Sequence, residues 1–176
     1  MLGSLLKAYC SARNKPAPYY ADYPLWLVLW KPIRKFVNVV IIPNIPSNHV
    51  RVWAYKLIGY QIGKNVFIGM KCYLDDMDPR KTIIEDNVVI SYGCFFAIHG
   101  RAQVHTNIRI KEGAYLGMRA NVISGKSGVS IGRHSIIGAA ALVTHSIPDD
   151  CTAFGVPARV VKRNNIEGEG DTFPDT

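Results

Sequence analysis

The residues of this sequence best suited to proton transfer are histidines and aspartates in two short polar segments. His99 and His105 lie in AIHGRAQVHTN, and Asp75 and Asp76 lie in LDDMDPR. Histidine is largely neutral at cellular pH yet able to accept a proton, so it suits a general base that takes a proton from an attacking hydroxyl. A carboxylate can orient the other ring nitrogen or bind sugar hydroxyls. We therefore identify His99 as the candidate base and the two aspartates as candidates for substrate contact.

An internal repeat of six residues surrounds these side chains and must position them. The large apolar residues of the repeat form four sets of three: Ile62, Ile68, Leu74; Ile84, Ile90, Phe96; Ile110, Leu116, Val122; and Ile131, Ile137, Val143. Neither an α-helix nor a simple strand predicts a period of six. Six residues can make one short strand and one turn, and three such units close a triangular coil. The pattern therefore predicts an all-β fold, a parallel β-helix of about four coils that stack at the strand spacing of about 4.8 Å.

The repeat is interrupted three times, always after the third unit of a coil. The excursions beyond the regular spacing are four, eight and three residues long, after Leu74, Phe96 and Val122 respectively. Because each follows the third unit, all three should leave the prism from one corner. The longest excursion contains His99. A long protrusion on a solenoid whose other connections are short predicts a functional loop. The same register places Asp75 and Asp76 one coil below this loop.

The chain divides by composition into three zones. Residues 1–57 form an expected helical or extended segment, 58–162 the repeat domain and 163–176 a polar tail. The first zone holds Trp26, Trp30 and Trp53 beside several basic residues. Two interpretations remain open for it: an amphipathic segment on the inner face of a membrane, or a helix packed on the first coil or on a neighbouring copy. Charged residues interrupt its most apolar stretch, so it should not cross a bilayer.

Composition places further limits on the protein. Apolar residues make up 48% and charged residues 19% of the chain, which indicates a globular protein. The net charge of +8 favours an anionic partner, which leaves nucleic acid, an acidic membrane and a phosphorylated cofactor open. The start is a poor signal peptide, and the cysteines form no CxxC pair, so we expect reduced thiols in a cytoplasmic protein. Cys72 should lie beneath Cys94, as two free thiols or as a redox pair.

The hexad pattern resembles the signature of left-handed β-helix acyltransferases. The stretch IGRHSIIGAAALVTHSIPDDCTAFGVPARVVKR resembles the closing segment of the maltose and galactoside O-acetyltransferases. The stretch IIEDNVVISYGCFFAIH resembles the strand and loop that deliver the catalytic histidine in acetyltransferases of colanic acid and capsular polysaccharide biosynthesis. The chain is thus identified as a member of the hexapeptide-repeat family over roughly residues 45–163. The resemblance implies a left-handed β-helix, a homotrimer, and acetyl-CoA held between neighbouring prisms with no metal required.

The resemblance further implies O-acetylation of a sugar or polysaccharide-precursor hydroxyl, with His99 as the base and no nucleic acid partner. It places an oxyanion donor near Gly117 and Met118. A wall of small residues would accommodate the pantetheine arm, basic residues near the C-terminus would meet the phosphates, and His145 stands where a lysine is common. The implied cofactor-binding set is Tyr115, Gly117, Met118, Ala139, Thr144, His145, Arg159 and Lys162.

Three other functions remain as alternatives. An N-acyltransferase acting on an aminosugar often carries an N-terminal nucleotide-binding domain, and the first 57 residues hold no GxGxxG motif. A zinc enzyme of the carbonic anhydrase type would need three converging histidines. A trimeric binding platform without turnover needs no site at all.

Overall fold

The structure is a computed structural model that describes residues 9–14, 25–99 and 106–163, with the side chains of 25–29 left aside. Its contacts divide the chain into two units, Met1–Val37 and Asn38–Thr176. The first unit contains α2 (Leu25–Phe36), which carries no acidic residue in its first turn and Arg34 and Lys35 in its last. The second unit contains the whole β-structure. Among the described residues, no helix is both long enough and apolar enough to span a bilayer.

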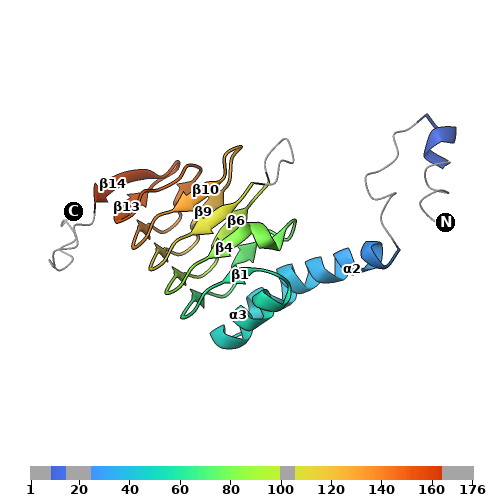
Figure 1. Cartoon of the computed structure of the whole chain (residues 1–176), viewed down its shortest axis with the longest axis horizontal. Coiled ribbons are helices and arrows are strands. Elements are labelled where there is room, and N and C mark those ends of the chain that lie inside the picture. The colour runs from blue at the N-terminus through green and yellow to red at the C-terminus, as the bar shows by residue number, and fades with distance from the viewer. Residues whose placement is uncertain (1–8, 15–24, 100–105, 164–176) are drawn as a thin grey trace. The chain divides into compact units, whose positions relative to one another are not determined.

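The second unit is a parallel β-helix with three faces (Figure 1). Face A consists of β1 (Gln61–Ile62), β4 (Thr82–Ile84), β7 (Ile108–Ile110) and β10 (Val129–Ile131). Face B consists of β2 (Phe67–Ile68), β5 (Val89–Ile90), β8 (Tyr115–Leu116), β11 (Ile136–Ile137), β13 (Cys151–Phe154) and β14 (Arg159–Arg163). Face C consists of β3 (Tyr73–Leu74), β6 (Phe95–Ala97), β9 (Asn121–Ile123) and β12 (Leu142–Val143). Every pairing is parallel except that of β13 with β14. The left-handed parallel β-helix of about four coils behind a partly helical N-terminal segment is thus confirmed.

The hexad residues form the core, as the repeat predicts. Ile62 pairs in register with Ile84, and Leu74 pairs with Phe96. All twelve large hexad residues are buried except Ile62 at the open first coil, which is half-buried. The second inward positions are buried as well, and they hold small side chains because the walls converge there. Each coil has three units, and each unit buries one large side chain. Burial of one such side chain stabilises the fold by about 1.5–3 kcal/mol.

Every long connection leaves from the corner between faces C and A, as the spacing predicts. The connections from β3 to β4, from β6 to β7 and from β9 to β10 are the interrupted ones. The first contains the 3-10 helix η4 (Pro79–Lys81). The second contains residues 100–105, so the position of His105 lies outside the described residues. This corner therefore gathers the irregular segments of successive coils along one edge of the prism.

A short helical region closes the open edge of the first coil. It comprises η2 (Val37–Ile41), η3 (Ile42–Asn44) and α3 (Asn48–Leu57). Asn48 Nδ2 donates to Val66 O at 3.0 Å, and Asn48 Oδ1 accepts from Ile68 N at 3.0 Å. The buried Arg51 donates from Nε to Ile68 O at 2.7 Å. These bonds satisfy main-chain groups that an uncovered sheet edge would leave unpaired.

The cysteine stack has the register that the repeat predicts. Cys72 and Cys94 are buried free thiols directly before the paired strands β3 and β6. Each thiol donates to a main-chain oxygen, Cys72 to Ser91 O at 3.1 Å and Cys94 to Gly117 O at 3.2 Å. The neighbouring Cys72, together with burial, raises the pKa of the Cys94 thiol. A low proportion of thiolate disfavours reaction at Cys94.

We expect that Gly69→Ala destabilises the protein by about 1–3 kcal/mol, because coils stack too closely for a side chain there. An added Cβ would lie 2.6 Å from the main-chain atoms Ser91 C and Tyr92 N, and neither can move without shifting a coil. Gly125→Ala is the matched control, since its Cβ would meet no atom within 4 Å. Urea unfolding of both variants checks this. Equal midpoints for the two would contradict the close packing of coils.

Candidate active site

His99 projects from the corner between faces C and A, directly after β6. The preceding coil places Asp75 at the same corner, directly after β3. His99 Nδ1 makes a short contact with Asp75 Oδ2. The imidazole side chain is 42% exposed, whereas the carboxylate is fully buried. The His99 ring therefore presents one edge to solvent and the other to the buried Asp75 carboxylate.

Asp75 is held by main-chain donors as well as by the histidine. Its Oδ2 accepts from Ile98 N at 2.9 Å and its Oδ1 from Met77 N at 3.0 Å. An ionised carboxylate only accepts hydrogen bonds, so His99 must carry its ring proton on Nδ1. The Nε2 lone pair is then free to accept a proton.

The burial of Asp75 bears on one expectation from the sequence. The sequence predicts that Asp75 contacts substrate, whereas the structure leaves its carboxylate with no exposed surface. Its contact with His99 Nδ1 fits the other role that the sequence left open for a carboxylate, which is to orient the histidine ring.

Asp76 lies at the margin of the site and is 9% exposed. Tyr73 Oη donates to Asp76 Oδ1 at 3.3 Å, and the Tyr73 ring stacks on Phe95 with centroids 4.7 Å apart. Burial and the neighbouring carboxylates of Asp75 and Asp76 raise the pKa of Tyr73 to about 12. The phenol therefore stays protonated near neutral pH and keeps donating to Asp76.

A buried tyrosine supports the turn that carries Asp75. Tyr60 Oη lies 3.0 Å from Asp75 O, 2.9 Å from Leu74 O and 3.1 Å from Asn38 Oδ1. Asn38 Nδ2 in turn donates to Leu74 O at 2.8 Å. Tyr60 is 3% exposed and Asn38 is fully buried. This layer fixes the main chain of Asp75 and connects it to the helical region before the first coil.

The two ends of the histidine loop are fastened to each other and to the next coil. Thr106 N donates to Ile98 O at 3.1 Å. Thr106 Oγ1 lies 2.6 Å from Ser124 Oγ and 2.9 Å from Gly125 O. Ser124 Oγ donates to Ala97 O at 3.3 Å. The segment that delivers His99 is therefore anchored at its base on both sides.

The expected cofactor residues lie at more than one place on the prism. Thr144 and His145 follow β12 of face C, at the same corner as His99, and Thr144 Oγ1 lies 2.9 Å from His145 Nδ1. Gly117 and Met118 follow β8 of face B, and Ala139 follows β11 of face B. That second corner joins faces B and C, so a single chain does not bring these residues beside His99.

The remaining expected residues lie on face B. Tyr115 is an outward residue of β8, 43% exposed, and its hydroxyl lies 3.2 Å from Ser91 Oγ. Arg159 and Lys162 are exposed on β14, the antiparallel strand that ends the sheet. Arg159 Nη1 donates to Ala158 O at 3.2 Å.

Comparison with known structures and sequences identifies the family. No family model matches the chain. A galactoside acetyltransferase solved with coenzyme A superposes with a TM-score of 0.62 at 22% identity, over 88% of this chain and 90% of that one. A hexapeptide-repeat acetyltransferase from Vibrio cholerae superposes with a TM-score of 0.62 at 17% identity, over 81% of this chain and 95% of that one. At these identities the likeness establishes the fold alone.

Sequence relatives carry the comparison further. The galactoside O-acetyltransferase of Escherichia coli (strain K12) is 31% identical over 135 residues, covering 70% of this chain and 66% of that protein. An acetyltransferase-like protein of Staphylococcus aureus (strain Mu50) is 34% identical over 140 residues, covering 75% of this chain and 66% of that protein. The chain belongs to the hexapeptide-repeat acyltransferases. It matches just under two thirds of the length of these relatives.

Within this hexapeptide-repeat acyltransferase, sequence reasoning missed the residues that support the site. Tyr60 and Asn38 lie before the first regular coil, where no repeat indicates their position. Thr106 and Ser124 lie in excursions, where the hexad register is suspended. Among the described residues, no group of three or more His, Cys, Asp or Glu side chains could hold a metal ion.

Proposed function

We propose that this hexapeptide-repeat acyltransferase transfers an acetyl group from acetyl-CoA to a sugar hydroxyl, with His99 as the general base. The observation that carries the proposal is the contact between His99 Nδ1 and the buried carboxylate of Asp75. It leaves Nε2 as an acceptor on the exposed edge of the ring. Relatives named galactoside O-acetyltransferase support the reaction type.

His99 Nε2 takes the proton from the acceptor hydroxyl as the hydroxyl oxygen attacks the thioester carbonyl. The thioester supplies the activated acetyl group, and its carbon–sulfur bond breaks as the ester forms. The imidazolium then returns the proton to the leaving thiolate. Asp75 stabilises the imidazolium and prevents the ring from turning, and a positioned base of this kind contributes about 10²–10⁴ in rate. A main-chain N–H near Gly117 and Met118 is the proposed oxyanion donor.

The residues proposed to bind acetyl-CoA fit a long, anionic and partly apolar molecule. Ala139 and Met118 are exposed at the corner between faces B and C, where small residues let an extended arm lie against the main chain. Arg159 and Lys162 are exposed cations suited to phosphates. Because His99 lies at another corner, we propose that a neighbouring copy completes the site in a homotrimer.

The acceptor is proposed from the surroundings of His99 and from the family. Asp76 keeps a small exposed surface beside Met77, which is 49% exposed, and could accept a hydrogen bond from a sugar hydroxyl. A polysaccharide precursor, as in the colanic acid and capsular subgroup, is the proposed acceptor class.

The test is a measurement of released CoA thiol with acetyl-CoA and a panel of sugars, nucleotide sugars and aminosugars. We expect turnover with hydroxyl acceptors and ester products that hydroxylamine cleaves. Products that resist hydroxylamine would indicate amide formation and an N-acyltransferase. Binding of acetyl-CoA without turnover on any acceptor would favour the non-catalytic platform.

A further inference from the structure

Helix α3 turns polar side chains toward the β-helix and apolar side chains outward, the reverse of an ordinary surface helix. Arg51 and Tyr55 are buried on its inner side, where Tyr55 Oη donates to a main-chain carbonyl of the first coil at 3.2 Å. On its outer side Val50, Trp53 and Leu57 are 48%, 61% and 65% exposed. Their spacing of three and four residues places them on one stripe, the α3 stripe. An exposed apolar stripe of this kind marks a site of association.

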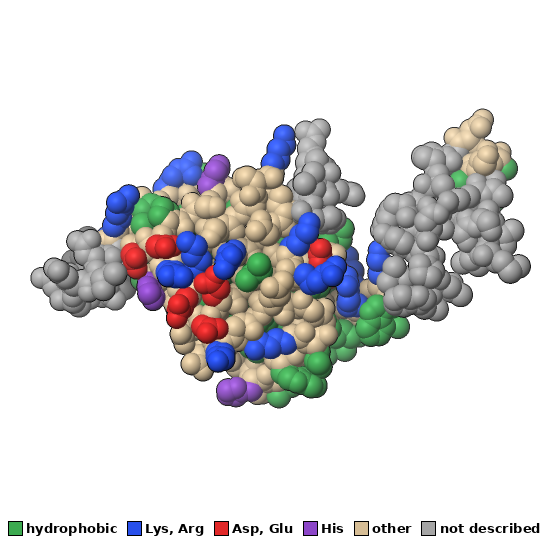
Figure 2. Space-filling model, viewed as in Figure 1, with side chains coloured by type: hydrophobic (Ala, Val, Ile, Leu, Met, Phe, Trp, Pro, Cys, Tyr) green, Lys and Arg blue, Asp and Glu red, His purple; other side chains and the backbone are tan. Residues whose placement is uncertain are grey.

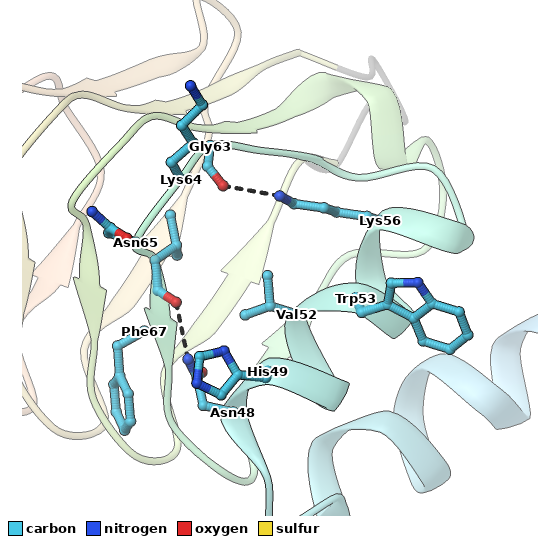
Figure 3. A pocket seen from close by; sticks show the side chains of 10 residues that line it. Asn48, His49, Val52, Trp53, Lys56, Gly63, Lys64, Asn65 and Phe67 are labelled. Carbon is cyan, nitrogen blue, oxygen red and sulfur yellow. Dashed lines mark hydrogen bonds between the residues drawn. The ribbon is translucent and has the colours of Figure 1, made fainter.

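A pocket opens beside the α3 stripe, between α3 and the first two strands. Its volume is about 450 Å³, and Trp53 belongs to both the pocket and the stripe. Lys56, Lys64 and His49 also line it, and Lys56 Nζ donates to Gly63 O at 3.0 Å (Figure 3). The pocket therefore combines cationic side chains with the edge of an apolar surface.

Helix α3 carries basic residues and no acidic ones, and the neighbouring turn at Lys64 lies against Asp86, whose Oδ1 accepts from Lys64 N at 2.7 Å. Between Asn38 and Leu74 the sequence has four lysines and arginines and not one aspartate or glutamate. Elsewhere on the β-helix opposite charges pair, as in Lys111 with Asp149 at 2.8 Å. Figure 2 shows acidic and basic side chains intermixed over one face of the β-helix. A partner for α3 must therefore be anionic and apolar together.

We propose that the α3 stripe and the adjoining pocket form a docking surface for an anionic lipid membrane. Trp53 and Leu57 enter the boundary between headgroups and acyl chains, where tryptophan is favoured. Lys56 and Lys64 lie at the level of the lipid phosphates, and each cation near such a surface adds to the attraction. Pairing with a second copy would bring the same lysines face to face without any acidic partner from α3, so a second copy fits less well.

The docking surface lies away from the proposed reaction site. Lys64 is in the turn between β1 and β2, at the corner between faces A and B. His99 lies at the corner between faces C and A, and the proposed CoA-binding residues lie at that corner, at the corner between faces B and C, and on face B. Figure 1 shows α3 beside β1, at the opposite end of the β-helix from β14. A membrane bound at α3 thus leaves the other corners open.

The test is co-sedimentation of the full chain with two kinds of vesicle, phosphatidylcholine alone and phosphatidylcholine with phosphatidylglycerol. We expect binding only to the anionic vesicles and its loss in high salt. Trp53→Ser and Lys64→Glu should each weaken binding about tenfold or more. The controls are Val161→Ser, at a position 52% exposed on β14, and Lys126→Glu in an exposed turn; both should bind like the unaltered chain.

Circular dichroism of each variant verifies that it is folded. Equal binding of the unaltered chain to both vesicles, or unchanged binding by Trp53→Ser and Lys64→Glu, would overturn the proposal. So would a change of oligomeric state in Trp53→Ser, seen by analytical ultracentrifugation, because the stripe would then be a surface for self-association. Vesicle binding needs no acetyl transfer, so the result stands apart from the outcome of the acceptor screen.

Discussion

Replacing His99 with alanine is expected to lower kcat for acetyl transfer by about 10²- to 10⁴-fold. The variant loses the acceptor for the hydroxyl proton, while the proposed CoA-binding residues stay in place. The dissociation constant for acetyl-CoA should therefore stay within about twofold of the unaltered value. Released CoA thiol measures the rate, and isothermal titration calorimetry measures the binding.

The matched control for His99 is His134→Ala, at an exposed turn on another edge of the prism. His134 Nδ1 lies 3.4 Å from Asp150 Oδ1, so this histidine also has a carboxylate partner. Unchanged kcat in His134→Ala together with a collapse in His99→Ala would assign the base. A His99→Ala variant with near-normal kcat would rule out His99 as the base.

The second large effect is expected for Asp75→Asn, which should lower kcat by about 10²-fold or more. The asparagine amide donates toward His99 Nδ1, so it favours the tautomer with the proton on Nε2, where a base needs its lone pair. The same substitution should cost about 1–3 kcal/mol of stability, because the amide cannot accept from both Met77 N and Ile98 N as the carboxylate does. Steady-state kinetics and urea unfolding measure the two effects.

The combination of substitutions distinguishes orientation from simple structural damage. If Asp75 acts through His99, the double variant should be no slower than His99→Ala alone. Asp78→Asn is the control on the same segment. Asp78 Oδ1 lies 3.5 Å from Arg80 Nε, so its ion pair is with this arginine rather than with His99. A loss of activity in Asp78→Asn equal to that in Asp75→Asn would mean that the turn as a whole, and not the Asp75 carboxylate, is responsible.

The sequence alone determined the coil, its register and the corner from which the long connections leave. A period of six with a large inward residue is a local constraint, because each strand and turn repeats the geometry of the one before. From Leu74 and Phe96 one can therefore place Asp75 below the histidine loop without coordinates. The family followed from the same pattern together with the closing segment.

Only the tertiary structure decided that Asp75 is buried against His99 and which residues support it. Burial depends on what covers a residue, and here the covering groups come from Tyr60, Asn38 and the main chain of the next coil. These residues obey no repeat, so no spacing in the sequence connects them to His99. The outward apolar stripe of α3 was hidden for the same reason. Which side of a helix faces inward is set by the polar edge of the first coil, where Arg51 and Asn48 satisfy unpaired main-chain groups.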